Sequence, residues 1–143
     1  MSDDTAARPR RPVWVWIIFV WFVFSVVWTL LSFYLIETGA LPLEPAQKAY
    51  FERLTTVDYA ASIVLALLNV AGAVALFMLR KAALPLFLAS VVLGLLVLAW
   101  QTVARGWTEA TGGSGLVGSA IGYALLIAVC LYAWRLTRRG VLR

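Results

Sequence analysis

The sequence predicts an all-α polytopic membrane protein, with four transmembrane helices in an up-down bundle. Of its 143 residues, 63% are hydrophobic and 13% are charged, and the mean hydropathy is +0.90. Soluble domains contain about 45–50% apolar and about 25% charged residues. Four apolar runs each reach the roughly 20 residues that a helix needs to cross a bilayer. We expect these spans at about residues 13–36, 57–79, 82–104 and 116–134.

The four runs leave only short segments at either end. We expect a cytoplasmic tail at residues 1–12, one transmembrane domain at residues 13–136 and a basic cytoplasmic tail at residues 137–143. With the amino terminus inside, most of the 12 Lys and Arg residues lie on the cytoplasmic side, as the positive-inside rule requires. The net charge of +5 is then a topology signal and indicates no nucleic-acid partner. We expect a multi-pass protein of the plasma membrane, specifically of a bacterial inner membrane.

The first span carries an aromatic stripe. Trp14, Trp21 and Trp28 recur every seven residues and therefore lie close to one helical face. A packing or lipid-facing stripe is the simpler interpretation, and a wall for a flat apolar ligand or for a partner's helix is the alternative. Hydroxyls on another side of this helix are expected to bond to carbonyls of their own helix or to a neighbouring helix. These are Ser25, Thr29 and Ser32.

A short amphipathic helix is expected before the second span. Pro45 is placed to begin a helix, and the residues after it carry an apolar side and a charged side. Such a helix lies flat in the outer interface, with Tyr50 and Phe51 at headgroup depth. A purely structural role is the simpler interpretation; a lid over a lateral opening or a docking surface is the alternative.

The second span is the one whose polar residues fall on a single helical face. Thr55 and Asp58 fit the capping pattern S/T-x-x-D, so Asp58 is expected to cap the helix, with contact to an ion or substrate as the alternative. Asn69 lies near the middle of the span, where an amide needs partners. We expect an interhelical hydrogen bond there, with ligand binding as the alternative.

The last two spans carry small residues suited to helix packing. Arg80 and Lys81 are the only link between the second and third spans, which therefore form a tight hairpin. An aromatic and basic belt then marks the outer interface. The glycine-rich segment at residues 104–115 is expected to be a flexible connection. The candidate packing residues, within the bundle or across an oligomer, are Ser90, Gly94, Gly118 and Gly122.

The residue types present argue against most catalytic, metal-binding and ion-coupling sites. The sequence has no histidine, which excludes histidine-held haem, histidine–metal sites and histidine acid–base catalysis. Acidic residues near the spans, Glu37, Asp58 and Glu109, stand at outer ends, which disfavours ion-coupled transport. Cys130 has no adjacent base and is a poor nucleophile. We therefore predict no catalytic residue, metal or cofactor.

Three functions remain open. The leading hypothesis is a non-enzymatic protein that acts through helix contacts, as an accessory subunit of other membrane proteins or as a homo-oligomer in the lipid bilayer. The first alternative is binding or transport of an apolar or amphipathic small molecule or lipid between the first two helices. The third is a lipid-modifying enzyme acting through Asp58 and Glu37 at the outer surface. Candidate ligand-binding residues are Trp21, Trp28, Asp58, Ser62 and Asn69.

Overall fold

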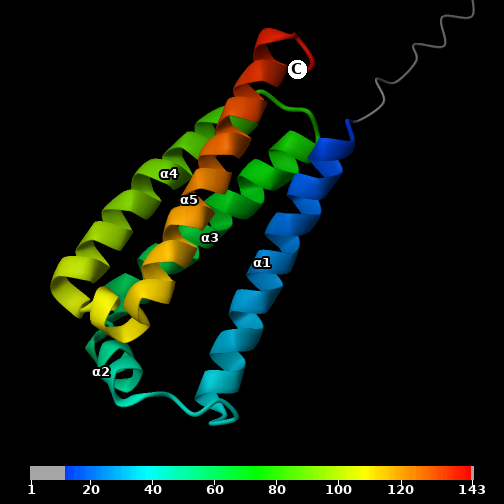
Figure 1. Ribbon diagram of the computed structural model, residues 1–143. Coiled ribbons are helices and arrows are strands. Elements are labelled where there is room, and N and C mark those ends of the chain that lie inside the picture. The colour runs from blue at the N-terminus through cyan, green and yellow to red at the C-terminus, as the bar shows by residue number, and fades with distance from the viewer. Residues whose placement is uncertain (1–11, 143) are drawn as a thin grey trace, which may run out of the picture.

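Long apolar helices dominate the computed structural model, which describes residues 12–142 (Figure 1). Its elements are α1 (Val13–Glu37), α2 (Pro45–Arg53), α3 (Thr56–Phe77), α4 (Ala83–Trp100), the π-helical turn η1 (Gln101–Arg105) and α5 (Trp107–Arg138). Four helices, counting α4 and η1 together, are long and apolar enough to cross a membrane. The predicted all-α, four-span fold is confirmed. Residues 1–11 of the predicted first tail, and Arg143 of the second, lie outside the described residues.

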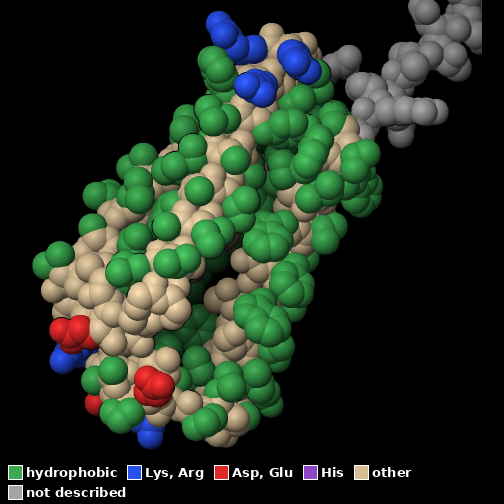
Figure 2. Space-filling view, viewed as in Figure 1, with side chains coloured by type: hydrophobic (Ala, Val, Ile, Leu, Met, Phe, Trp, Pro, Cys, Tyr) green, Lys and Arg blue, Asp and Glu red, His purple; other side chains and the backbone are tan. Residues whose placement is uncertain are grey.

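The charges separate along the bundle. The two described ends of the chain lie at one end, here called the termini end, and α2 lies at the other, the α2 end (Figure 1). Figure 2 shows Lys and Arg side chains gathered where α5 finishes and acidic side chains near α2. Within residues 12–142, every Asp and Glu belongs to a segment at the α2 end. The termini end is therefore the basic end.

α3 and α4 form the most extensive helix pair. After α3 ends, Leu79 adopts a left-handed conformation with φ 56°, and the Arg80 amide donates to the Ala75 carbonyl at 2.8 Å. This is the tight hairpin that the sequence predicts. Gly72 lets the helices approach, because a Cβ there would lie 3.0 Å from the ring of Phe87 on α4.

α1 packs against this hairpin through aromatic rings near the termini end. The Phe19 ring stacks on Phe77 of α3 with 4.7 Å between centroids, and the Trp16 ring meets Phe77 edge-on at 4.8 Å. Toward the α2 end, the ring contact of α1 is with α2 instead, between Phe33 and Phe51 at 6.4 Å. α5 packs on α4 and α2. Both α1 and α5 therefore contact α2, but α1 packs on the hairpin mainly through α3 and α5 mainly through α4.

The prediction of a flexible connection at residues 104–115 is wrong. α5 begins at Trp107, directly after the left-handed Gly106 (φ 74°), rather than near residue 116. Gly112 (φ 62°, ψ −161°) has a non-helical backbone, and two helical segments of α5 meet there in a kink. Backbone groups without partners are costly near hydrocarbon, which favours continued helix over open loop. The Thr111 hydroxyl also donates to the Trp107 carbonyl at 2.8 Å.

α2 is the helix predicted before the second span, and it begins at Pro45. The Glu44 amide donates to the Gln47 side-chain oxygen at 3.1 Å, which caps its first turn. Tyr50 is buried, with its ring 5.5 Å from that of Trp107. α2 is thereby anchored to the start of α5.

Candidate functional site

Adjoining cavities form a lateral groove between α1 and α5. Two cavities of about 340 and 290 Å³ share lining residues from α1, α3, α4 and α5. A third of about 360 Å³ shares Trp21, Phe22, Leu125 and Val129 with the second. Figure 2 shows the hollow between the surfaces of α5 and α1. Since the first and last spans do not close over it, the groove is open to the lipid side of the bundle.

The polar section of the groove lies toward the α2 end and the middle of the bundle. Side chains from every spanning helix reach it, so residues far apart in the sequence share one surface. No charged side chain lines these cavities within residues 12–142. The polar lining residues are Ser25, Thr29, Ser62, Asn69, Gln101, Ser119 and Tyr123.

Asn69 is fixed at the floor of the polar section. The Ser90 hydroxyl, fully buried on α4, donates to the Asn69 Oδ1 atom at 2.6 Å. This is the interhelical hydrogen bond expected of Asn69. The bond engages the acceptor atom of the amide, while the donor atom Nδ2 has no protein hydrogen bond within the described chain. Asn69 therefore offers the groove an N–H donor.

The hydroxyl groups of the groove fall into two sets. Thr29 donates to the carbonyl of Ser25 at 2.8 Å, and Ser62 donates to the carbonyl of Asp58 at 3.0 Å, so both bond to their own helices. Among residues 12–142, the hydroxyls of Ser25, Ser119 and Tyr123 make no hydrogen bond to protein. These three hydroxyls are available to water or to a ligand.

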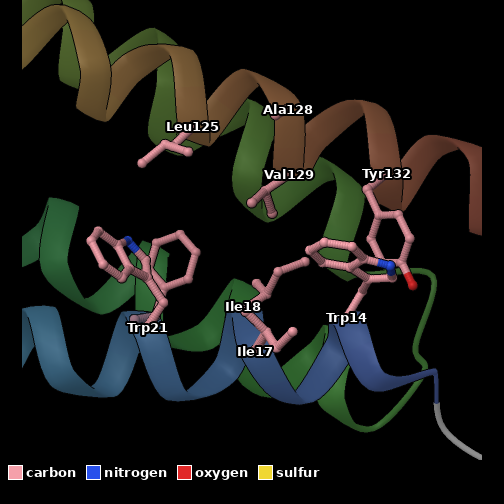
Figure 3. Close-up of a pocket in the computed structure, with 9 residues that line it drawn as sticks. Trp14, Ile17, Ile18, Trp21, Leu125, Ala128, Val129 and Tyr132 are labelled. Carbon is pink, nitrogen blue, oxygen red and sulfur yellow. The ribbon is translucent and has the colours of Figure 1, made fainter.

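The apolar section of the groove continues toward the termini end. Figure 3 shows side chains of α1 and α5 facing each other across it, with the Trp14 ring opposite Tyr132. Aromatic and aliphatic walls of this kind hold hydrocarbon chains without needing polar partners. The facing residues are Trp14, Ile17, Ile18 and Trp21 on α1, and Leu125, Ala128, Val129 and Tyr132 on α5.

Asp58 is engaged by protein groups beside the groove. The amide and the hydroxyl of Thr55 donate to its Oδ2 atom at 2.8 and 2.9 Å, which is the predicted capping box. Arg105 forms an ion pair with the same oxygen at 2.9 Å, and Trp100 Nε1 donates to Oδ1 at 3.2 Å. The Asp58 side chain is 3% exposed. These contacts favour a structural role for Asp58, as a cap and a tie between α3 and η1.

The π-helical turn η1 places two side chains in different settings. Its first residue, Gln101, lines the polar section, and its last, Arg105, reaches across to α3. The Arg105 guanidinium also lies 5.9 Å from the centre of the Trp100 ring. Nearby, burial and the negative charge of Asp58 raise the pKa of the Tyr50 hydroxyl.

The structure brings together three of the five predicted ligand-binding residues. Trp21, Ser62 and Asn69 line the groove. Trp28 does not: it is 60% exposed and stacks on Phe24 with 6.1 Å between centroids. Asp58 lies beside the groove with its oxygens engaged.

The predicted packing residues fall into two pairs, one at close helix contacts and one without them. Ser90 bonds to α3, and a Cβ on Gly94 would lie 2.7 Å from the Tyr123 hydroxyl of α5, so both stand at close helix contacts. Cβ atoms on Gly118 and Gly122 would meet nothing within 4 Å. These two glycines therefore make no close contact inside a single copy of the described chain, and contact across an oligomer stays a prediction.

Sequence reasoning gives no binding role to several residues in or beside the groove. The belt expected at the outer interface includes Gln101 and Arg105, of which Gln101 lines the groove and Arg105 lies beside it, paired with Asp58. Ser119 and Tyr123 also line the groove. A usable signal was present for one pair. Asp58 and Arg105 stand nearly equally far from the Arg80-Lys81 turn, and opposite charges at equal depth in a hairpin are expected to meet.

No metal site emerges from the residues that the structure describes, since no three His, Cys, Asp or Glu side chains gather there.

Comparison of the chain with family models, with curated proteins and with solved structures gave no match. The fold and the groove define the class directly: a small four-span helical membrane protein with a laterally open, partly polar groove.

Proposed function

We propose that this chain binds an amphipathic small molecule or lipid in the lateral groove. The observation that carries the proposal is the polar section itself, an uncharged hydrogen-bonding surface at bilayer depth that opens toward lipid. The ligand lies between α1 and α5, with α3 and α4 beneath it. The sequence-based alternative placed such a ligand between the first two helices; the present proposal keeps α1 and α3 as lining helices and adds α5 as the opposite wall.

The free-energy cost of unpaired polar groups favours a ligand that has a polar part as well as a hydrocarbon part. Polar groups without partners in hydrocarbon each cost several kcal/mol. Lipid tails in the groove would leave the hydroxyls of Ser25, Ser119 and Tyr123 without partners. A molecule with a polar part and an apolar part satisfies both sections at once, as is usual for ligand sites between the helices of bundles.

A blocking substitution tests the proposal. Gly122 lines the groove and no atom lies within 4 Å of its Cβ position, so the ring of Gly122→Trp would occupy the groove. The adjacent Ile121 is 56% exposed and lines none of the groove cavities, so Ile121→Trp is the matched control. Native mass spectrometry after gentle extraction from the host membrane would reveal a persistent small-molecule mass on the control. Retention of that mass by Gly122→Trp would refute the proposal.

A second candidate function is helix-mediated assembly, as a homo-oligomer or as a subunit of another membrane complex. It is supported by Gly118 and Gly122, whose bare face on α5 permits close approach of a second helix. Gly118 lines none of the groove cavities, so Gly118→Leu tests assembly separately from ligand binding. Under this candidate the variant would be monomeric and free of other chains in native mass spectrometry.

We also propose that the protein spans a plasma membrane, specifically a bacterial inner membrane. Both termini then lie in the cytoplasm. The support is the basic termini end, which the positive-inside rule assigns to the cytoplasm. In a Cys130→Ala background, Gln47→Cys on α2 would react with an impermeant maleimide on intact cells. Arg139→Cys would react only after permeabilisation; the reverse pattern would invert the topology.

A further inference from the structure

We infer that the molecule held in the groove is an uncharged lipid whose polar end carries carbonyl oxygens, and that this end lies against Asn69 with its chain directed toward Trp14. The inference rests on the proposed function and adds the chemical class and the orientation of the ligand. Three features of the groove lead to it: its charge, its hydrogen-bond donors and its two-part shape.

The charge of the lining excludes an ionic headgroup. The polar section contains no charged side chain, and the nearest acidic and basic residues, Asp58 and Arg105, neutralise each other at 2.9 Å. Asn69 lies near the middle of α3, so a phosphate or carboxylate placed against it would be buried at bilayer depth without a counter-charge. The headgroup of a phospholipid is more stable at the membrane surface. The ligand's polar end is therefore neutral.

The hydrogen-bonding groups around Asn69 favour an acceptor. Asn69 Nδ2 is a donor without a protein partner in the described chain, and the oxygen of the same amide already accepts a hydrogen bond from Ser90. The hydroxyls of Ser25, Ser119 and Tyr123 have no protein partner in the described chain and can each donate a proton. A carbonyl oxygen accepts two such bonds and brings no proton that needs an acceptor. Ketone-type oxygens of a quinone ring and ester oxygens of a diacylglycerol share this chemistry.

The shape of the groove sets the orientation. Trp21 and Phe22 line both the polar cavity around Asn69 and the apolar cavity that reaches Trp14, so one molecule can occupy the two sections. From Thr29 to Trp14 the groove follows α1 for about 22 Å. The apolar section at the termini end is lined almost entirely by aliphatic and aromatic carbon, and the polar atoms that Figure 3 shows there belong to Trp14, Trp21 and Tyr132. The chain of the lipid therefore lies there, and its polar end lies toward α2.

A binding assay with defined probes tests the inference. The full-length protein, in phosphatidylcholine nanodiscs, would be titrated with four lipids: decyl-benzoquinone, dioleoylglycerol, oleate and dioleoylphosphatidylglycerol. The dissociation constant would be measured by native mass spectrometry and checked by thermal stabilisation. We expect one of the two neutral probes to bind at one copy per chain, more than tenfold more tightly than either anionic probe. Whichever neutral probe is preferred identifies the source of the carbonyl.

Two variants locate the polar end. Asn69→Leu removes the N–H donor, and Ser119→Ala removes one hydroxyl without touching the Asn69–Ser90 bond, which keeps the test valid if the first variant folds poorly. Each is expected to weaken binding of the preferred neutral probe about two- to tenfold, the effect of one lost hydrogen bond. The control Trp28→Phe lies outside the groove and is expected to leave binding unchanged.

The outcomes separate this inference from the proposed function. If an anionic probe binds as tightly as the neutral ones and Gly122→Trp abolishes its binding, the groove is a lipid site but the neutral-carbonyl inference is wrong. If neutral probes bind and both donor variants bind them as well as the wild type does, the orientation is wrong. If no probe binds and the host-extracted protein carries no small molecule, the proposed function fails with the inference.

Discussion

The Ser90 hydroxyl on α4 donates to the Asn69 amide oxygen on α3 at 2.6 Å, in the centre of the most extensive helix pair. The bond has two consequences. It joins the two helices where both would otherwise bury a polar group in an apolar interior. It also determines which half of the amide faces the groove, so a packing contact controls the chemistry of the candidate site.

Removing this bond is expected to destabilise the bundle modestly. Ser90→Ala should lower the free energy of unfolding by about 0.6–2 kcal/mol, the range for interhelical hydrogen bonds in membranes. Unfolding in mixed detergent and SDS micelles measures it. Ser114→Ala is the control, because the Ser114 hydroxyl is exposed and bonds only within its own helix. Equal stability of the two variants would mean that the bond contributes nothing.

The ion pair between Asp58 and Arg105 is expected to stabilise the α2 end. Asp58→Asn keeps the side-chain size but leaves the Arg105 guanidinium without its counter-charge, which should cost about 1.5–3 kcal/mol. The double variant Asp58→Asn/Arg105→Gln should recover part of this loss, because no charge is then left unpaired. A double-mutant cycle on unfolding free energies measures the coupling. Strictly additive effects would show that the two side chains act independently.

The kink in α5 gives a matched pair of glycine substitutions. Gly112 has φ 62° and ψ −161°, a conformation that essentially only glycine adopts, so Gly112→Ala should cost about 1–3 kcal/mol. Gly113 has neither a positive φ nor any atom within 4 Å of its Cβ position. Gly113→Ala should be neutral, or stabilising by up to about 1 kcal/mol through helix propensity. Thermal unfolding of the two variants side by side checks the order, and a reversed order would place the kink elsewhere.

Gly94 is expected to control the position of Tyr123. A Cβ at Gly94 would lie 2.7 Å from the Tyr123 hydroxyl, so Gly94→Ala must displace that side chain within the groove. We expect a loss of ligand retention greater than that caused by Tyr123→Phe, which removes the hydroxyl alone. Native mass spectrometry of both variants makes the comparison. A Gly94→Ala protein that retains ligand like the wild type would mean that the ring has room to move.

Local patterns in the sequence were sufficient for much of the fold. Apolar length predicts the four spans, Pro45 predicts the start of α2, and Thr55 with Asp58 predicts the capping box. Each of these depends on neighbours within a few residues. The glycine-rich start of α5 was predicted as a loop because of its composition, but it is largely helical. Its low-dielectric surroundings favour backbone groups that are hydrogen-bonded within a helix.

The groove could be predicted only in part. The stripe containing Ser62 and Asn69 indicates that this face of α3 turns inward, and Trp21 was recognised as a possible ligand wall. Which helices stand opposite is decided by packing over long sequence separations. The aromatic contacts of α1 with Phe77 and the contacts of α5 with α4 leave the first and last spans apart, and no periodicity within either helix encodes that separation.

The π-helical turn η1 gives the α2 end a place where the chain can lose a residue without losing its register. A π-helical turn holds one residue more than an α-helical turn. Val103, in the middle of η1, is 88% exposed and packs against little of the bundle. Deleting Val103 would let α4 continue as regular α-helix with Arg105 still on the side that faces Asp58. In a regular stretch of α4, by contrast, one deletion would rotate every residue after it by about 100° and separate this ion pair.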